Sequence, residues 1–337
     1  MVKQHKVLVI GVGSIGERHV RCFQDTGRVD ASLLEIDEAL ARTVAERYGV
    51  SAHADLDSAL ATGVEAAVVA TPAPLHVPLA TRLVEAGLHV LIEKPLSTTL
   101  DGIERLRQAV IERGVVAAVA YVYRSHPALA AMRQAICEGR FGRPVELVVV
   151  AGQHFPTYRP AYRTIYYANR ACGGGAIQDA LTHLVNAGEW LLGPTDRLVV
   201  DARHQLLEDV VVEDTVHVLA RHGSALASYA LNQYQAPNEA TLTVVCQRGT
   251  ARFESHRQRW RWMTEPGESW HDEHHEAVAR DTIFIAQAHA FLDAIEGRTP
   301  PPCTLDEGLQ TLRVNLAALA SLQDQTWKVV GTDGEKS

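Results

Sequence analysis

The sequence predicts an α/β protein of two domains, a doubly wound parallel sheet followed by a domain built around an antiparallel sheet. Two patterns favour this organisation. Short apolar strands alternate with helices over the first part of the chain, and runs of strands without intervening helices follow after residue 196. The length of 337 residues agrees with it, because roughly 150 residues per domain corresponds to about two domains.

The first part of the chain alternates strands buried on both faces with helices that end at glycine. Continuous apolar runs such as 6–10 and 66–70 are typical of central strands in a parallel sheet. Gly49, Gly87 and Gly114 follow three of the helical segments, where glycine commonly closes a helix. We expect strands over 6–10, 31–36, 66–70, 90–92 and 115–121, and helices over 15–26, 38–48, 75–86 and 100–113.

The pattern changes after about residue 125, and we place the domain boundary at residues 124 and 125. Residues 156–175 form an irregular segment rich in Arg and Tyr that ends in three consecutive glycines. Strand runs separated only by short turns then predict an antiparallel sheet. We expect helices over 127–139, 176–192, 282–296 and 306–322, and strands over 145–155, 197–203, 214–221, 225–232, 240–246, 250–254 and 258–263.

Composition excludes several classes of function. The net charge of −8 argues against general binding of nucleic acid, because a phosphate backbone requires an excess of Lys and Arg. The five cysteines contain no CxxC pair, which indicates a reducing compartment. No run approaches the roughly 18 apolar residues of a membrane helix. We therefore expect a cytoplasmic protein with neither a nucleic-acid nor a membrane partner.

Gly11-x-Gly13-x-x-Gly16 follows a predicted strand and opens a predicted helix, which is the arrangement of a dinucleotide-binding turn. There the first glycine permits a tight turn, the second lets a pyrophosphate approach the backbone, and the third lets helix pack on strand. Glu35 lies about twenty residues farther on, where a carboxylate binds the ribose hydroxyls and repels a 2′-phosphate. This favours NAD over NADP. Asp37 is the alternative acid on the same strand face.

Two further segments follow predicted strands and are therefore expected at the ligand-binding edge of the sheet. The loop Thr71–His76 is expected to line the cofactor, with His76 at a helix start. In Glu93-Lys94-Pro95, the lysine ammonium is suited to polarise a substrate hydroxyl or carbonyl oxygen. The Lys-Pro sequence also raises the odds of a cis peptide bond.

The segment from Gly173 to His183 carries an acid and a base on one predicted helix. Asp179 and His183 are four residues apart and share one helix face. Histidine transfers protons near neutral pH, and a carboxylate one turn away can orient it or hold a substrate hydroxyl. On spacing alone such a pair is more often a solvated helix pair. The glycine run lets backbone approach a ligand or a facing domain.

These motifs together resemble the Gfo/Idh/MocA oxidoreductases, the family of glucose–fructose oxidoreductase and inositol dehydrogenase. The resemblance spans almost the whole chain, including its ending at 305–317. It implies a Rossmann NAD(P)-binding domain over 1–124 and a substrate-binding and oligomerisation domain over 125–337 with a large, mostly antiparallel open sheet. It also implies a homodimer or homotetramer through that sheet, and hydride transfer between NAD and a hydroxyl carbon of a sugar, amino sugar or cyclitol.

By position, the resemblance implies that Lys94, Asp179 and His183 are catalytic. His183 takes the hydroxyl proton, Lys94 polarises the oxygen, and Asp179 tunes His183 or holds an adjacent hydroxyl. The expected cofactor-binding residues are Gly11, Gly13, Ser14, Ile15, Gly16, Glu35, Thr71, Pro72, Leu75, His76, Glu93 and Lys94. The expected substrate-binding residues are Lys94, Tyr123, Arg163, Tyr166, Asp179 and His183.

Alternatives remain at this point. Leu181, Asn186 and Val122 stand where many relatives carry Gly, Asp and Asn, so the motifs do not identify the substrate. The same fold also permits an NAD-dependent glycosidase, an imine reductase or a non-catalytic NAD-binding regulator.

Other polar clusters have two interpretations each. The segment with Arg159, Tyr162, Arg163, Tyr166 and Tyr167 is either a polar wall over the substrate, with Arg binding a carboxylate or phosphate, or a surface loop with aromatic anchors. We assign no metal site. The histidine cluster at 271–275 is expected in a polar connector, and Trp260 and Trp262 are expected on one strand face, possible contacts of a subunit interface.

Overall fold

The computed structural model describes residues 4–275, 279 and 281–331, and the chain divides into two compact units. The first comprises Met1–Ser125 and Ala279–Leu309, and the second His126–Val278 and Gln310–Ser337. The sequence pattern does not indicate that Ala279–Leu309 belongs with the first unit. The assignment of functions to domains 1–124 and 125–337 stays a prediction.

The first unit contains a six-stranded sheet in which every pairing is parallel. The strand order is β3-β2-β1-β4-β5-β6, so the order reverses between β1 and β4. A crevice at such a reversal is the usual ligand site of an open α/β sheet. The strands are β1 His5–Ile10, β2 Val29–Leu34, β3 Ser51–His53, β4 Ala66–Val69, β5 His89–Ile92 and β6 Ala117–Val119. The helices are α1 Ser14–Asp25, α2 Glu38–Tyr48, α3 Leu56–Leu60, α4 His76–Glu85, α5 Ile103–Arg113 and α9 Thr282–Ile295.

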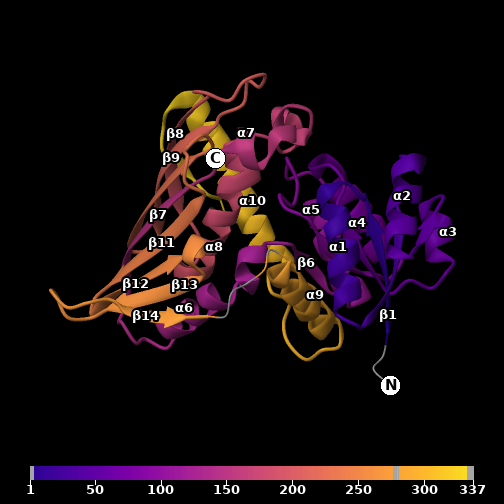
Figure 1. Cartoon of the computed structure of the whole chain (residues 1–337), viewed down its shortest axis with the longest axis horizontal. Helices are drawn as coiled ribbons and strands as arrows, with labels where there is room; N and C mark the ends of the chain where they lie inside the picture. Colours follow the sequence, from indigo (N-terminus) through magenta and orange to yellow (C-terminus); the bar gives the residue numbers. More distant parts are fainter. Residues whose placement is uncertain (1–3, 276–278, 280, 332–337) are drawn as a thin grey trace. The chain divides into compact units, whose positions relative to one another are not determined.

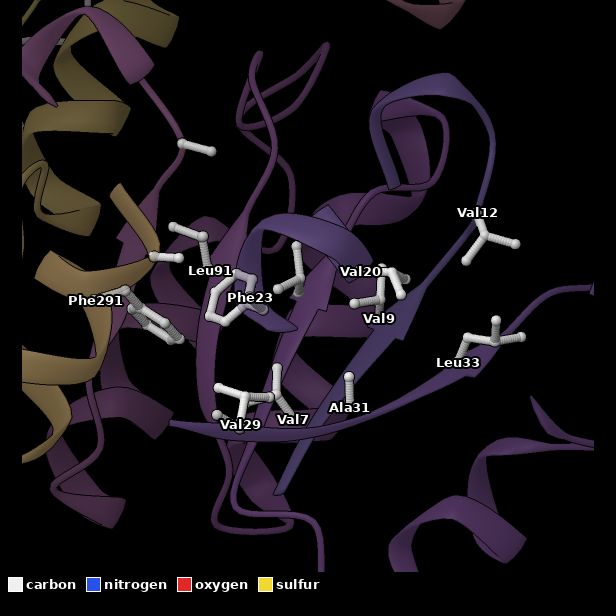
Figure 2. Packing of buried hydrophobic residues seen from close by; sticks show 14 of the residues in the cluster. Val7, Val9, Val12, Val20, Phe23, Val29, Ala31, Leu33, Leu91 and Phe291 are labelled. Carbon is white, nitrogen blue, oxygen red and sulfur yellow. The ribbon is translucent and has the colours of Figure 1, made fainter. Parts of the chain in front are cut away.

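Helix α9 belongs to this unit because its apolar face completes the core of the parallel sheet. It packs against α1 and the short turn Val122–Ser125. Phe291 of α9 is fully buried, and its ring meets that of Phe23 in α1 edge to face, with 6.3 Å between the centroids. Figure 2 shows these two rings beside Leu91 of β5, in the same cluster as Val7 and Val9 of β1.

The second unit contains a nine-stranded sheet of order β14-β13-β12-β11-β7-β10-β9-β8-β15. Its pairings are antiparallel except for that of β7 with β10. Helices α6, α8 and the later part of α10 lie on one side of this sheet (Figure 1). The strands are β7 Pro144–Gly152, β8 Arg197–Arg203, β9 Thr215–His222, β10 Ala225–Asn232, β11 Glu239–Cys246, β12 Gly249–Glu254, β13 Arg259–Met263, β14 His271–His274 and β15 Lys328–Val329. The helices are α6 Pro127–Cys137, α7 Phe155–Tyr158, α8 Thr182–Leu192 and α10 Leu305–Asp324.

The fold class predicted from the sequence is confirmed, and two local expectations are corrected. The segment at 271–274 is the edge strand β14 rather than a connector, and the His271 ring stacks on Trp262 with 4.0 Å between centroids. Trp260 and Trp262 share a face, but Phe141 of the same unit contacts both rings. Trp260, at 4% exposed, is therefore covered within the chain and has little surface left for a partner subunit, whereas Trp262 is half-buried.

Within the described part of the chain, no helix is both long enough and apolar enough to cross a bilayer. The same residues contain no group of three or more His, Cys, Asp or Glu side chains arranged to hold a metal ion.

Candidate functional site

The glycine turn between β1 and α1 shows why three glycines are required. Gly11 has a φ of +81°, and a Cβ atom there would lie 2.8 Å from the carbonyl oxygen of Ala70 after β4. A Cβ on Gly16 would overlap the carbonyl of Gly11. A Cβ on Gly13 would meet no protein atom within 4 Å, and no side chain caps the start of α1. The turn thus leaves open space at the positive end of a helix, which fits a pyrophosphate.

Glu35 follows β2 directly and lies against the glycine turn. Its carboxylate accepts the Val12 N–H at 2.8 Å and the Asp37 N–H at 3.1 Å. Asp37 instead caps α2, because its side chain accepts the N–H groups of Ala39 and Leu40, both at 3.0 Å. The structure thus places Glu35, rather than the alternative acid, beside the dinucleotide turn.

The loop after β4 is fixed by a buried histidine. The His76 ring lies between two carbonyl oxygens, with Nε2 2.7 Å from that of Thr71 and Nδ1 2.9 Å from that of Pro95. Burial lowers the pKa of His76. Both nitrogens face the protein, so we expect His76 to position the two loops rather than to bind a ligand itself. The Thr71 hydroxyl is buried with no hydrogen-bond partner in the described structure, which fits a ligand at this strand end.

Lys94 follows β5 at the same carboxyl edge of the sheet, and its peptide bond to Pro95 is cis, as predicted. Glu93 is 5% exposed, and its carboxylate fixes this segment through two hydrogen bonds. One carboxylate oxygen lies 2.7 Å from Nε2 of buried His19 in α1, and the other accepts the Lys94 N–H at 3.1 Å. The lysine backbone is therefore attached to the helix that carries the glycine turn.

In the second unit, the predicted helix over 176–192 begins with an irregular turn. Residues Ile177–Leu181 form one π-helical turn, and regular helix α8 follows from Thr182. Such turns occur often at functional sites, because the extra residue changes the direction of side chains. Asp179 lies inside this turn and His183 lies just after it.

Asp179 is 2% exposed and is held by two side chains from the irregular segment before it. The Tyr166 hydroxyl donates to one carboxylate oxygen at 2.5 Å, and Arg159 Nη1 lies 3.2 Å from the other. The Asp179 charge raises the pKa of the Arg159 guanidinium. A carboxylate with a cation and a short hydroxyl bond is stabilised in its ionised form.

The second and third glycines of the run before this helix lie against protein groups. A Cβ on Gly174 would collide with the carbonyl of Tyr167, and one on Gly175 would lie 2.5 Å from Glu213 Oε1. Glu213 is 2% exposed. It accepts the Ile177 N–H at 3.1 Å and pairs with Arg170 at 2.5 Å. A buried carboxylate thus fixes the start of the helix that carries Asp179.

Of the remaining residues predicted to bind substrate or cofactor, some lie at the sites described above and others do not. Tyr166 is brought to Asp179, whereas Arg163 pairs with Glu208 at 2.9 Å and with Asp209 at 3.4 Å on the exposed side of the loop. Tyr123 lies in a half-buried turn of the first unit. Further candidates lie along the edge already described: Ser14, Ile15, Pro72 and Leu75.

Sequence reasoning missed several residues that the structure brings to these sites. Glu213 lies 36 positions from Ile177 and 43 from Arg170, the residues that it contacts, and no local pattern connects them. Arg159 was one of several arginines in an irregular segment. Ile36 ends the predicted strand 31–36, but it lies beyond β2 and is 99% exposed beside Glu35.

Comparisons with known proteins agree on one family. Residues 5–121 match a family model described as "Oxidoreductase family, NAD-binding Rossmann fold", and residues 129–252 match the "GFO/IDH/MocA C-terminal domain". The inositol 2-dehydrogenase/D-chiro-inositol 3-dehydrogenase of Shouchella clausii (strain KSM-K16) is 30% identical over 194 residues. That alignment covers 56% of this chain and 53% of the relative, so the chain spans about half the length of that relative.

Solved structures share the whole fold. A levoglucosan dehydrogenase in complex with NADH has a TM-score of 0.90 at 21% identity, covering 98% of this chain and 100% of that one. GenD2 from gentamicin A biosynthesis, in complex with NAD, has a TM-score of 0.84 at 26% identity, covering 98% of both chains. With both family models matched across the two units, the chain belongs to the Gfo/Idh/MocA family of NAD-binding oxidoreductases.

Proposed function

We propose that this protein is an NAD-dependent dehydrogenase that oxidises a CH–OH group of a sugar, amino sugar or cyclitol, or reduces the corresponding ketone. The observation that carries the proposal is Lys94, which follows β5 at the sheet edge that also carries the glycine turn. An ammonium at that edge lies where the cofactor of a doubly wound sheet binds. Relatives named for inositol and levoglucosan support the substrate class.

The cofactor is held by the first unit. The backbone of Gly11–Gly16 accommodates the pyrophosphate, and the Glu35 carboxylate binds the adenosine ribose hydroxyls. A carboxylate there repels a 2′-phosphate, which favours NAD over NADP. The exposed side chain of Ile36 supplies an apolar surface for the adenine ring.

Lys94, Asp179 and His183 act on one substrate. In the oxidation, the hydroxyl proton passes to the His183 imidazole while the C–H bond breaks and a carbonyl forms. NAD⁺, when bound, would supply the acceptor for the hydride that leaves this carbon. Lys94 stabilises the negative charge that develops on the oxygen, and Asp179 orients His183 or an adjacent hydroxyl.

The test is an NADH-absorbance screen with neutral sugars, amino sugars, uronates and inositols, followed by Lys94→Ala on the substrate found. We expect the variant to lose about 10²–10⁴-fold in kcat while its NADH affinity, measured by fluorescence, stays within twofold. An unchanged kcat would contradict the role of Lys94. If NAD binds but no substrate in the panel produces NADH, a glycosidase, an imine reductase or a regulator becomes the better reading.

We also propose a cytoplasmic homo-oligomer formed through the face of the nine-stranded sheet opposite α6 and α8. Val150, Leu219 and Leu226 are 46%, 56% and 48% exposed there. Their register with Ser228 and Ala230 places all three on one face. Light scattering should report a dimer or tetramer, and Leu219→Asp should shift it towards the monomer. A wild-type protein that is monomeric at micromolar concentration would contradict this.

A further inference from the structure

Three arginines of the irregular segment before the glycine run each pair with a different carboxylate. Arg159 lies 3.2 Å from Asp179, Arg163 2.9 Å from Glu208, and Arg170 2.5 Å from Glu213. The first pair differs from the second in burial, because the Asp179 side chain is 1% exposed whereas that of Glu208 is 77% exposed. Glu213 of the third pair is also buried, but of these carboxylates we assign only Asp179 to the reaction.

The side chain of Arg159 is oriented by more than its charge. Its guanidinium carbon lies 5.3 Å from the centre of the Phe155 ring, and Phe155 is itself 3% exposed. Phe155 in turn packs on Tyr167 at 5.0 Å between centroids. An arginine stacked on a buried ring has little freedom to turn towards an incoming anion.

The Asp179 carboxylate has one partner at each oxygen from this segment. Tyr166 donates to Oδ1 at 2.5 Å and Arg159 approaches Oδ2. Within its own unit, Asp179 interacts electrostatically with Arg159 and Tyr167 and accepts the Tyr166 hydroxyl, and His183 follows on the same helix. Tyr167 is neutral at ordinary pH, because burial raises the pKa of its hydroxyl.

We propose that Arg159 is a positioning residue for the reaction: together with Tyr166 it holds Asp179 as an oriented, ionised carboxylate, and it is not a receptor for an anionic group of the substrate. This rests on the proposed function, because it assumes that Asp179 takes part in catalysis. Arg159 then binds the enzyme's own carboxylate. It is neither a substrate-binding arginine nor a surface one, the two roles that the sequence left open.

The first experiment compares pH profiles of kcat/KM for the wild type, Arg159→Gln, Arg159→Lys and Arg163→Gln, with the substrate found in the NADH screen. Removing a cation 3.2 Å from the Asp179 carboxylate lets the neighbouring Asp179 and His183 take up a proton at higher pH, by about 1–3 units for a close arginine. We expect the acid limb of Arg159→Gln to move to higher pH by at least one unit, and Arg159→Lys to restore it in part.

Arg163→Gln is the matched control, because it removes an arginine of the same segment with similar exposure, 38% against 44%. Whatever its effect on KM, its acid limb should coincide with that of the wild type. Equal shifts in both glutamine variants, or an unmoved limb in Arg159→Gln, would overturn the proposal. The proposal would also fall if Arg159→Gln lost activity only on uronates while the acid limb of its kcat/KM profile stayed in place, because Arg159 would then bind an anionic group of the substrate.

The second experiment does not depend on turnover. Thermal unfolding of Arg159→Gln, Asp179→Asn and the double variant forms a double-mutant cycle at neutral pH. If the two side chains stabilise each other, the double variant loses no more in melting temperature than the worse single variant. Additive losses in melting temperature would refute the pairing of Arg159 with Asp179, even in an active enzyme. Non-additive losses together with a fully active Asp179→Asn variant would refute only the catalytic role of Asp179. Tyr166→Phe supplies a second route if Arg159→Gln does not fold.

Discussion

Two glycine-rich turns in this protein each open a helix, but their glycines are required for different reasons. In the turn Gly11–Gly16, the central Gly13 faces open space, and the flanking glycines let β1, β4 and α1 approach. In the run Gly173–Gly175, the second and third glycines face Tyr167 and Glu213 of the same unit. The first turn leaves room for a ligand, and the second lets protein groups close on the helix that carries Asp179.

A glycine motif is recognisable in a sequence when it binds a ligand, and much less so when it only lets side chains pack closely. A turn that binds a ligand through its backbone repeats the same spacing in any protein, because the shape of the ligand is fixed. A turn that lets side chains converge depends on residues distant in sequence, here Glu213, Tyr166 and Arg159. Variants of the two turns should therefore fail in different ways.

The largest effect is expected from Gly16→Ala, because the new methyl group would overlap backbone that cannot move without separating α1 from β1. We expect a loss of about 3 kcal/mol or more in the free energy of unfolding, with loss of NADH binding. Chemical denaturation and NADH fluorescence would measure both. A stable variant with normal NADH affinity would contradict the close packing of this turn.

Gly175→Ala should damage catalysis while sparing cofactor binding. Its φ of +88° is strained for alanine, and the methyl would push on Glu213 Oε1 at 2.5 Å and shift the start of the helix. A misplacement of about 1 Å in a catalytic group costs on the order of 10²-fold in rate. Steady-state kinetics should show that loss in kcat with NADH affinity within twofold. As a control, Gly139→Ala has a similar φ of +76° with no neighbour within 4 Å, and should leave kcat unchanged.

Gly13→Ala should weaken cofactor binding without destabilising the fold. Its φ of −59° suits alanine and the added carbon would meet no non-neighbouring protein atom within 4 Å, so the melting temperature should stay the same or rise slightly. The methyl occupies the space proposed for the pyrophosphate, and we expect NADH affinity to fall roughly tenfold. Calorimetric titration that finds unchanged affinity would place the pyrophosphate elsewhere.

Glu35→Gln sharpens the comparison at the other end of the cofactor. The amide oxygen can still accept the Val12 N–H, but the charge that repels a 2′-phosphate is removed. The ratio of NADP to NAD affinity should rise about tenfold. If the wild type already prefers NADP by more than tenfold, the assignment of Glu35 is wrong.

The smallest effect is expected away from both turns, at Glu296 after α9. Hydrogen bonds from His5 and Arg28 lower the pKa of its carboxyl to about 2. A lowered carboxyl pKa stabilises the fold above the ordinary value near 4.5 and loses that contribution as the pH falls towards 2. Glu296→Gln should therefore lower the melting temperature by a few degrees at pH 7.

The difference between wild type and Glu296→Gln should shrink between about pH 5 and pH 2, and kcat should stay the same at pH 7. Arg298→Gln is a useful comparison, because it removes an exposed partner of the same carboxylate. A constant difference at every pH would show that the charge of Glu296 contributes nothing.

Much of the fold was predictable from local pattern. Helix α2 and strands β8 and β10 have the predicted bounds, because their apolar periodicity and flanking turns agree. The edge strand β14 was missed, since a strand with one open edge carries polar residues and resembles a connector. The association of α9 with the first unit was missed because it depends on the contact of Phe291 with Phe23, which is not local.

The glycine turn and the lysine after β5 were predictable from the amino-acid sequence, because strand ends and backbone turns follow from nearby residues. The folded chain alone shows which acid lies beside the turn, which arginine pairs with Asp179 and which carboxylate fixes the helix start. Those choices depend on side chains that meet across loops and strands. Several equivalent residues compete for each role, and packing rather than spacing selects among them.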